Sequence, residues 1–319
     1  MAKRLLTSVF MTLALAGLLA CSHLDVLQPV TRSTDQIARI REWLVTRPAV
    51  TNQSSVDSLR NLKLEDGYHF VEYAWSSTFT YDARERLIAE DMDGYRDSGD
   101  YGIEKKKVAY RYSYQPDELV ATQTTTFGGN YRSETSQHLS LNQQGRVAAA
   151  PLLAGLGYWG QYSMSQLVKD AVMPFAKDVL RTYNAEGLLI KTQSDLVAAP
   201  PELFRTVRVQ QVDKGNVTSV QIQRLDKNLT TTATSAPVVV ESIRYTYDPA
   251  KPGFRSPYQF MGVTNRNLIV QSVRHVATGG ADQISDYQYE FDDKGRVKHY
   301  IIRNSVYDTI VGDITYVQP

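Results

Sequence analysis

The chain has 319 residues, of which 35 are Lys or Arg and 34 are Asp or Glu, so its formal net charge is only +1. No basic patch stands out in this balance, which argues against nucleic acid as a partner. A single cysteine excludes an internal disulfide, so an exported domain of this kind must be stabilised by burial of its core alone. Tyrosine is abundant, at 20 residues. It favours half-buried strands, with the ring on the sheet and the hydroxyl in water.

Residues 1–20 have the composition of an export signal. Lys3 and Arg4 precede a stretch, 5–20, that contains no charged residue, which is the order of the charged and apolar regions of a secretion signal. The apolar stretch is shorter than the roughly 20 residues of a membrane-spanning helix. It ends in Leu-Leu-Ala before Cys21, which resembles a bacterial lipobox. The resemblance implies cleavage before Cys21, acylation of its thiol by fatty chains of the palmitate type, and firm membrane attachment.

The alternative for the N-terminus is an ordinary cleaved signal in which Cys21 is incidental. Cys21 is the chain's single cysteine and stands where a lipobox requires it, which favours the lipoprotein. We expect a tether over 21–32 and a single β-rich domain over 33–319. Removal of the signal leaves 33 basic and 34 acidic residues.

The first expected element of the domain is a helix. Ser33 and Gln36 have the spacing of a capping box, and Pro48 ends the apolar stripe that follows. This pattern predicts a helix over 34–46 that packs on the β domain, with a partner-binding helix as the alternative. Its apolar stripe consists of Ile37, Ile40, Trp43 and Leu44. A second helix is possible at 163–173.

From Leu59 onward, alternation of apolar and polar residues predicts strands that are separated by turn signals. The fold class that follows is all-β: a long curled antiparallel sheet built from a meander of β-hairpins, with one short N-terminal helix packed on it. The clearest alternating runs are His69 to Tyr81, Tyr110 to Tyr114, Tyr245 to Tyr247 and Tyr287 to Phe291.

The turn signals recur along the chain. An Asp or Asn side chain accepts hydrogen bonds from the amides that follow it, and a glycine three residues later adopts the left-handed conformation that closes the hairpin. In the first copy Glu85 stands at the glycine position, so another geometry is open there. The residues predicted to form these turns are Asp82, Asn142, Gly145, Asn184, Gly187, Asp248, Asp292 and Gly295.

These hairpins resemble the YD-type repeats of RHS-like proteins, whose core is a tyrosine-aspartate turn followed by Gly-Arg. Residues 243–300 are similar to a narrower group, the YD-containing lipoproteins of Gram-negative bacteria, for which no activity is established. The similarity is carried by Tyr247-Asp248, by Asn265-Arg-Asn267 and by 287–297. It implies a curled antiparallel sheet on an exported lipoprotein.

The sequence contains no catalytic or cofactor motif. No histidine has the spacing of a zinc site, and no serine lies in a nucleophile elbow, so no metal and no cofactor are expected. An acidic stretch could suggest a calcium loop, but its spacing does not fit an EF-hand, and a polar hairpin loop is favoured. The acidic stretch consists of Asp91, Asp93, Asp97 and Asp100. The histidines are His23, His69, His138, His275 and His299.

The segment 155–162 combines three aromatic residues with three glycines. Tyr158, Trp159 and Tyr162 are therefore candidate ligand-binding residues, because aromatic rings on a flexible backbone can stack on a sugar or cover an apolar ligand. The alternative is a loop whose aromatic rings fold back onto the sheet.

Two functions remain open. The first is an outer-membrane lipoprotein that acts as a non-catalytic scaffold or binding module of the cell envelope, for an envelope protein, a glycan or an apolar ligand. Ser22 is not the aspartate that often retains lipoproteins at an inner membrane, and no acidic run follows it, so the periplasmic face of the outer membrane is favoured. The second is a hydrolase of envelope or extracellular polysaccharide, which requires two carboxylates roughly 5–10 Å apart in one cleft.

Overall fold

The computed structural model describes residues 35–45, 71–97, 103–127, 131–150, 179–193, 197–199, 202–227, 236–305 and 309–318. All of them lie within one compact unit that extends from Ser33 to Gln318. The signal 1–20, the tether 21–32 and the possible helix at 163–173 lie outside the described residues. No helix among these ranges is long and apolar enough to cross a membrane.

The described residues form seventeen strands and one 3₁₀ turn, Gln259–Met261. The strands are β1 (Ile37–Val45), β2 (Val71–Tyr81), β3 (Leu87–Asp97), β4 (Ile103–Tyr114), β5 (Glu118–Phe127), β6 (Tyr131–Leu141), β7 (Val147–Ala150), β8 (Val179–Tyr183), β9 (Leu189–Gln193), β10 (Val197–Ala199), β11 (Glu202–Asp213), β12 (Asn216–Lys227), β13 (Val238–Pro252), β14 (Asn267–Val276), β15 (Gln283–Phe291), β16 (Val297–Asn304) and β17 (Thr309–Tyr316).

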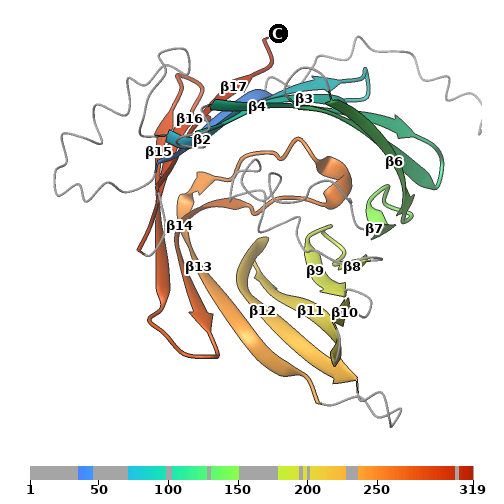
Figure 1. Ribbon diagram of the computed structural model, residues 1–319. Helices are drawn as coiled ribbons and strands as arrows, with labels where there is room; N and C mark the ends of the chain where they lie inside the picture. The colour runs from blue at the N-terminus through green and yellow to red at the C-terminus, as the bar shows by residue number, and fades with distance from the viewer. Residues whose placement is uncertain are drawn as a thin grey trace, which may run out of the picture. The chain divides into compact units, whose positions relative to one another are not determined.

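The strands form one antiparallel sheet that closes into a barrel (Figure 1). Each strand from β1 to β9 pairs with the next, the same holds from β11 to β17, β9 also pairs with β11, and β1 pairs with β17. Because β9 and β10 pair with successive parts of the same side of β11, they share one position. The ring therefore has sixteen positions.

The all-β hairpin meander is confirmed, but the open curled sheet is wrong. An open sheet leaves unpaired N–H and C=O groups along both edges, and closure removes both edges. Here the pairing of β1 with β17, from Ile37↔Tyr316 to Val45↔Thr309, joins the first and last described strands.

The N-terminal helix predicted over 34–46 is also wrong, because this stretch is strand β1. The apolar residues that suggested a helical stripe serve a strand with an irregularity between Ile37 and Arg39. Ile40 and Glu42 are buried on the inner face, opposite Ser77 and Trp75 of β2. Pairing with β2 and β17 satisfies every backbone group that a helix would have satisfied internally, so the tertiary pairing overrides the local periodicity.

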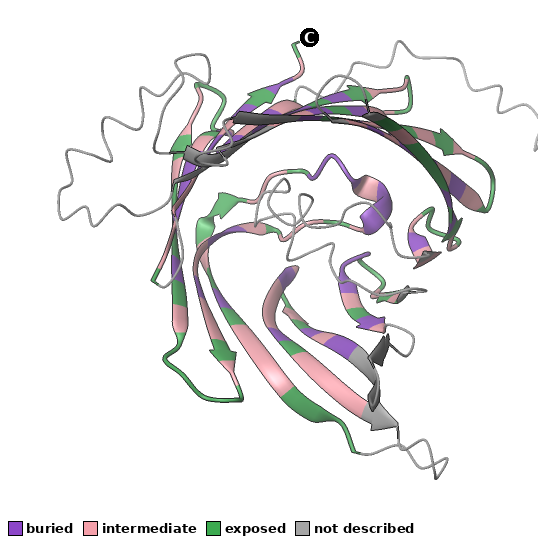
Figure 2. Ribbon diagram, viewed as in Figure 1, coloured by how far each residue is buried: buried purple, intermediate pink, exposed green. Residues whose placement is uncertain are grey.

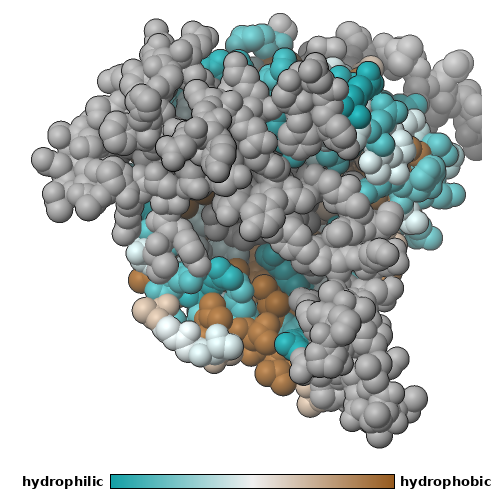
Figure 3. Space-filling model, in the orientation of Figure 1, coloured by the Kyte–Doolittle hydropathy of each residue, from teal (hydrophilic) through white to brown (hydrophobic). Residues whose placement is uncertain are grey.

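The two faces of the barrel wall differ in polarity. Along β15 the burial alternates strictly, with Ser285 and Tyr287 buried and Asp286 and Gln288 exposed. Figure 2 shows buried, intermediate and exposed residues mixed along the other described strands, without the strict alternation of β15. On the part of the surface visible in Figure 3 that is described, hydrophilic residues predominate at the upper right and a hydrophobic area lies low in the view. The exposed side chains of β6 are all polar: Arg132, Glu134, Thr135, Ser136, His138 and Ser140.

The Asp and Asn turns lie at one end of the barrel, here called the turn end, because alternate connections of an antiparallel meander fall on the same side. The connection between β13 and β14 also starts there, but it folds into the barrel (Figure 1). We call residues Gly253–Arg266 the inserted segment. Its buried residues Tyr258, Phe260 and Met261 join the main core, where the Tyr258 ring meets Phe79 edge-on at 5.9 Å.

The inserted segment is fixed at its base by backbone hydrogen bonds. The Arg266 amide donates to the Gly215 carbonyl at 2.9 Å, and the Val263 amide donates to the Gly187 carbonyl at 3.1 Å. The Val217 amide donates to Asn265 Oδ1 at 2.8 Å. These bonds attach the segment to two of the short turns, so it is part of the wall's architecture rather than a free loop.

A buried carboxylate lies on the seam where the barrel closes. Glu42 of β1 is fully buried and accepts hydrogen bonds from Trp75 Nε1, at 2.8 Å, and from the Tyr300 hydroxyl. The Tyr300 ring, also fully buried, covers Gly312 of β17, where a Cβ atom would overlap it. The glycine is therefore needed for a close approach of backbone and ring.

Candidate functional site

The residues predicted to carry lipid or ligand cannot be placed. Cys21, Tyr158, Trp159 and Tyr162 all lie outside the described residues. The predicted turn residues are described, and they lead to a cavity.

Four Asp or Asn residues form the same turn. Asp292 Oδ1 accepts hydrogen bonds from the amides of Lys294 and Arg296 at 3.0 and 2.8 Å, and Gly295 has φ +76°. Asp82, Asn142 and Asn184 repeat the arrangement, with Gly145 and Gly187 also at positive φ. Asp248 differs, since its carboxylate bonds only the Ala250 amide and β13 continues to Pro252.

The arginine that follows two of these turns binds back to the turn carboxylate. Arg296 and Arg86 contact Asp292 and Asp82 at 2.6 and 2.7 Å. For Asp292, the hydrogen bond from the Arg296 side chain is the main cause that lowers its pKa. Burial works to raise the pKa of Asp82, but hydrogen bonds from Arg86 and the Arg84 amide outweigh it and the pKa is lowered.

The same arginines lie over tyrosine rings of a later strand. Arg86 stands 4.4 Å above the Tyr114 ring and Arg296 stands 4.2 Å above Tyr316. The Tyr114 hydroxyl donates to the Leu87 carbonyl at 3.1 Å, so each unit ties two hairpins together. We expected tyrosine hydroxyls to point into water, which is wrong for six residues of the described strands. Their hydroxyls donate to main-chain carbonyls: Tyr81, Tyr114, Tyr183, Tyr247, Tyr289 and Tyr316.

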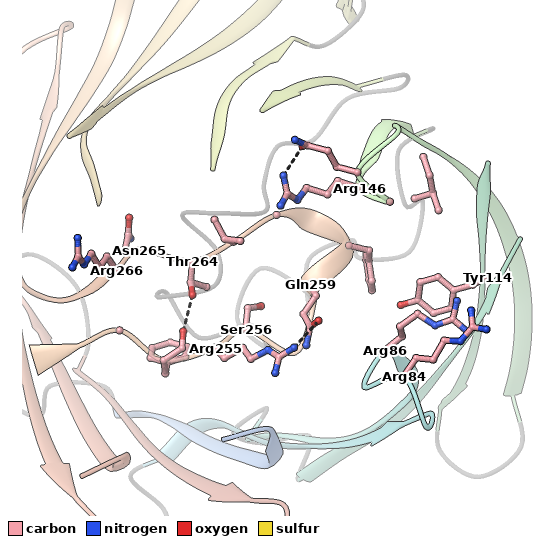
Figure 4. A pocket seen from close by; sticks show the side chains of 18 of the residues that line it. Arg84, Arg86, Tyr114, Arg146, Arg255, Ser256, Gln259, Thr264, Asn265 and Arg266 are labelled. Carbon is pink, nitrogen blue, oxygen red and sulfur yellow. Dashed lines mark hydrogen bonds between the residues drawn. The ribbon is translucent and has the colours of Figure 1, made fainter. Parts of the chain in front are cut away.

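A cavity of about 1230 Å³ opens at the turn end between these turns and the inserted segment. Figure 4 shows Arg84, Arg86 and Tyr114 on one wall and Arg255 with Gln259 on the inserted segment that faces it. Among the described residues that line the cavity there are five arginines and no carboxylate: Arg84, Arg86, Arg146, Arg255 and Arg266. Such a lining favours a ligand that carries several negative charges.

Two of the arginines are held in place by carboxylates just outside the cavity. Arg86 binds Asp82, and Arg255 Nη1 donates to Glu85 Oε2 at 3.0 Å. The Arg255 guanidinium also donates to Gln259 Oε1 at 3.1 Å. Arg84 lines the cavity beside Arg86 and Arg255, and it forms no ion pair among the described residues.

The ion pair between Glu85 and Arg255 accounts for a glutamate at the turn position where the other copies have glycine. Glu85 stands at the glycine position with φ +61°, a conformation that costs a non-glycine residue roughly 1–2 kcal/mol. The turn keeps the common geometry, because the Glu85 amide donates to the Asp82 carbonyl at 3.0 Å. A glycine would fit the backbone better but could not reach Arg255.

The backbone strain at Glu85 lowers stability and its ion pair with Arg255 raises it. We therefore expect the effects of Glu85→Gly and Arg255→Ala on the free energy of unfolding to be non-additive. In an Arg255→Ala background, Glu85→Gly should raise the free energy of unfolding by about 1 kcal/mol, since only backbone strain is relieved. In the native background the gain should be smaller by about 0.5–1 kcal/mol, the contribution of a partly exposed ion pair. Urea unfolding of the four proteins measures the coupling. Equal effects in both backgrounds would contradict the proposed link.

Beneath the inserted segment lies a buried carboxyl group. Glu90 of β3 is buried and lies close to Tyr258 and Ser77. Burial raises its pKa to about 7, against the interaction with the Tyr258 hydroxyl, which lowers it. Glu90 and Glu42 bind separate core residues, and neither lines the cavity.

Asp91, Asp93 and the described histidines His138, His275 and His299 form ion pairs near the surface, whereas Asp100, His23 and His69 lie outside the described residues. Asp91 and Asp93 of β3 contact Arg111 and Lys107 of β4. His299 Nδ1 lies 2.6 Å from Asp313 Oδ1 in a shallow outer pocket. Within the ranges that the structure covers, no group of three His, Cys, Asp or Glu residues could hold a metal ion.

The cavity arginines were not singled out from the sequence. A signal was present for two of them, because Arg86 and Arg146 each follow the glycine position of a turn. Arg266 lies in the Asn265-Arg-Asn267 motif, which was noted only for the family resemblance, and no motif contains Arg255. Both reach the cavity because the inserted segment folds inward.

No family model and no curated protein matches the chain. Among solved structures, a porin-like protein from Bacteroides uniformis is 12% identical, with a TM-score of 0.49 over 88% of this chain and 98% of that one. A porin-like protein from Bacteroides vulgatus is 10% identical, with a TM-score of 0.45 over 89% of this chain and 100% of that one. At these values the likeness assigns no function to this chain.

Proposed function

We propose that the protein is a lipoprotein of the cell envelope, attached to a membrane through lipid on Cys21, whose barrel stands in water as a non-catalytic binding module. The observation that carries the proposal is the polarity of the barrel's outer face. A barrel that spans a membrane needs an apolar outer band about 25 Å tall, and a basic residue at the midplane costs about 2–4 kcal/mol.

The outer face of the described strands does not offer such a band. Asp91 and Arg111 pair there at 2.7 Å, and Arg132 pairs with Glu134 at 3.4 Å. Threonines fill the outer positions of β5, where Thr122 bonds to Ser136 at 2.9 Å. The apolar residues of the main core pack around the inserted segment. The exposed large apolar side chains of the described residues are Leu180, Val238, Val239, Val263 and Ile284. This arrangement suits water outside, so the membrane contact has to come from elsewhere in the chain, and the lipobox-like sequence before Cys21 supplies it.

The outer membrane is the favoured location, with the barrel on its periplasmic side, because Ser22 replaces the aspartate that signals retention at an inner membrane. The resemblance to YD-containing lipoproteins points the same way. The hydrolase alternative needs two carboxylates in one cleft. The buried carboxylates of the described residues, Glu42 and Glu90, contact different core residues, and neither lines the cavity, so we favour binding over catalysis.

Fractionation of cells that produce Cys21→Ala tests this proposal. We expect most of the variant in the soluble fraction, whereas the native protein and Ser22→Ala remain with membranes. A second variant, in which an ordinary cleavable signal replaces residues 1–21, excludes retention by an uncleaved leader. Ser22→Asp should move the protein to the inner-membrane fraction. If both variants without Cys21 stay in the membrane fraction, the barrel itself is embedded and the proposal fails.

A further inference from the structure

We propose that the arginine-lined cavity at the turn end binds a phosphorylated saccharide that carries at least two phosphoryl groups. This inference rests on the proposed function, since it names the ligand of the binding module. It depends on the charge of the lining, on the size of the cavity and on the way in which its arginines are held.

The charge of the lining is the first argument. Asp82 and Glu85 each neutralise one arginine, while Arg84, Arg146 and Arg266 have no acidic partner in the described part of the chain. The described part of the lining therefore keeps three positive charges and contains no carboxylate. Guanidinium groups bind phosphate oxygens through paired, charge-assisted hydrogen bonds, which makes a phosphorylated ligand the natural complement.

The size and neutral groups of the cavity favour a saccharide over a lone anion. A volume of about 1230 Å³ is far larger than a single phosphate ion requires. Gln115, Gln144 and Gln259 place side-chain amides on the lining, and amides both donate to and accept from sugar hydroxyls. The Tyr114 ring provides an aromatic edge beside them.

The third argument is preorganisation. Arg86 is held between Asp82 and the Tyr114 ring, and Arg255 is held by Glu85 and Gln259. Side chains ordered before binding lose less conformational entropy when the ligand arrives.

The remaining charges are well separated. Figure 4 shows Arg84 and Arg266 on opposite sides of the cavity. A ligand with two spaced phosphoryl groups offers one group to each side of the cavity, whereas a monophosphate offers a group to one side alone.

Calorimetric titration of the purified full-length protein in neutral detergent tests the proposal, with fructose 1,6-bisphosphate as the probe and fructose and inorganic phosphate as comparisons. We expect the bisphosphate to bind at least tenfold more tightly than inorganic phosphate, and fructose to show no binding. Arg84→Gln and Arg266→Gln should each weaken the bisphosphate about tenfold or more, as expected for the loss of a charge-assisted contact. A higher salt concentration should also weaken the binding of the bisphosphate to the native protein.

The matched control is Arg111→Gln, which removes an exposed arginine on the outer face, away from the cavity. It should leave the affinity unchanged, and the urea midpoints of all three variants should match that of the native protein. If the bisphosphate does not bind, or if Arg111→Gln weakens it as much as Arg84→Gln, the inference is overturned. The lipid anchor and the water-exposed barrel would stand, because fractionation tests them independently.

Vesicles distinguish a free ligand from a lipid headgroup of the same chemistry. The Cys21→Ala protein is mixed with phosphatidylcholine vesicles that contain either phosphatidylinositol bisphosphate or phosphatidylinositol. Sedimentation with the bisphosphate vesicles alone, lost in Arg84→Gln, supports a phosphorylated glycolipid headgroup, and titration without sedimentation supports a free saccharide. Equal sedimentation with both vesicle types, unchanged in Arg84→Gln, would count against the phosphate chemistry.

Discussion

Replacing Gly312 by alanine is expected to lower the free energy of unfolding by about 3 kcal/mol. The new Cβ would overlap the Tyr300 ring, which is fully buried and cannot move aside. Displacing the ring would also break the hydrogen bond from the Tyr300 hydroxyl to Glu42, which would leave a buried carboxylate with one donor fewer. The measurement is urea-induced unfolding followed by circular dichroism.

Gly94→Ala is the matched control, because Gly94 also lies within a strand of the barrel wall. The nearest atom to its added Cβ is the Lys106 carbonyl oxygen at 3.7 Å, an ordinary contact. This variant should lose no stability and could gain up to about 1 kcal/mol through the unfolded state. Tyr300→Phe keeps the ring and should cost about 2 kcal/mol through the hydrogen bond alone. A Gly312→Ala protein as stable as Gly94→Ala would show that the seam is packed differently.

Glu90→Gln is expected to make the protein about 3 kcal/mol more stable at pH 8 and to change little at pH 4.5. The folded state keeps the Glu90 proton up to pH about 7, whereas the ordinary pKa is 4.5. Between these values the native protein binds more protons folded than unfolded. Its stability therefore falls as the pH rises through this range, and the loss is complete above pH 7. Glutamine carries no proton to lose, so its curve should lack this fall.

The measurement is the free energy of unfolding in urea at several pH values from 4.5 to 8. All other titrating groups are common to both proteins, so the difference between the curves isolates Glu90. Glu134→Gln, on the exposed outer face beside Arg132, should shift stability by no more than about 0.5 kcal/mol throughout. Parallel curves for the native protein and Glu90→Gln would mean that Glu90 is not buried beneath Tyr258.

The hairpin turns could be predicted because their chemistry is local. Asp292 bonds to amides two and four residues ahead, and the positive φ of Gly295 follows from the same five residues. The strands could likewise be predicted from the alternation of apolar and polar residues. Glu85 departs from the pattern, and its carboxylate binds Arg255, which is 170 residues away in the sequence.

The N-terminal helix was predicted wrongly for the complementary reason. Capping-box spacing and a helical stripe are local signals, whereas β1 is stabilised by pairing with β2 and β17, which are distant in the sequence. Glu42 shows this most clearly, since its bond to Tyr300 spans 258 positions. Short-range patterns do not indicate which strands will be the first and last of a ring.

The sequence by itself determined the all-β meander and the residues that make its turns, because each depends on neighbours along the chain, while lipid attachment at Cys21 stays a prediction. Only the tertiary structure decided that the sheet closes and that five arginines among the described residues, from two turns and the inserted segment, line one cavity. Closure depends on pairing of the chain's distant ends, and the cavity depends on a segment folding inward. Both are determined by long-range packing, which no local pattern encodes.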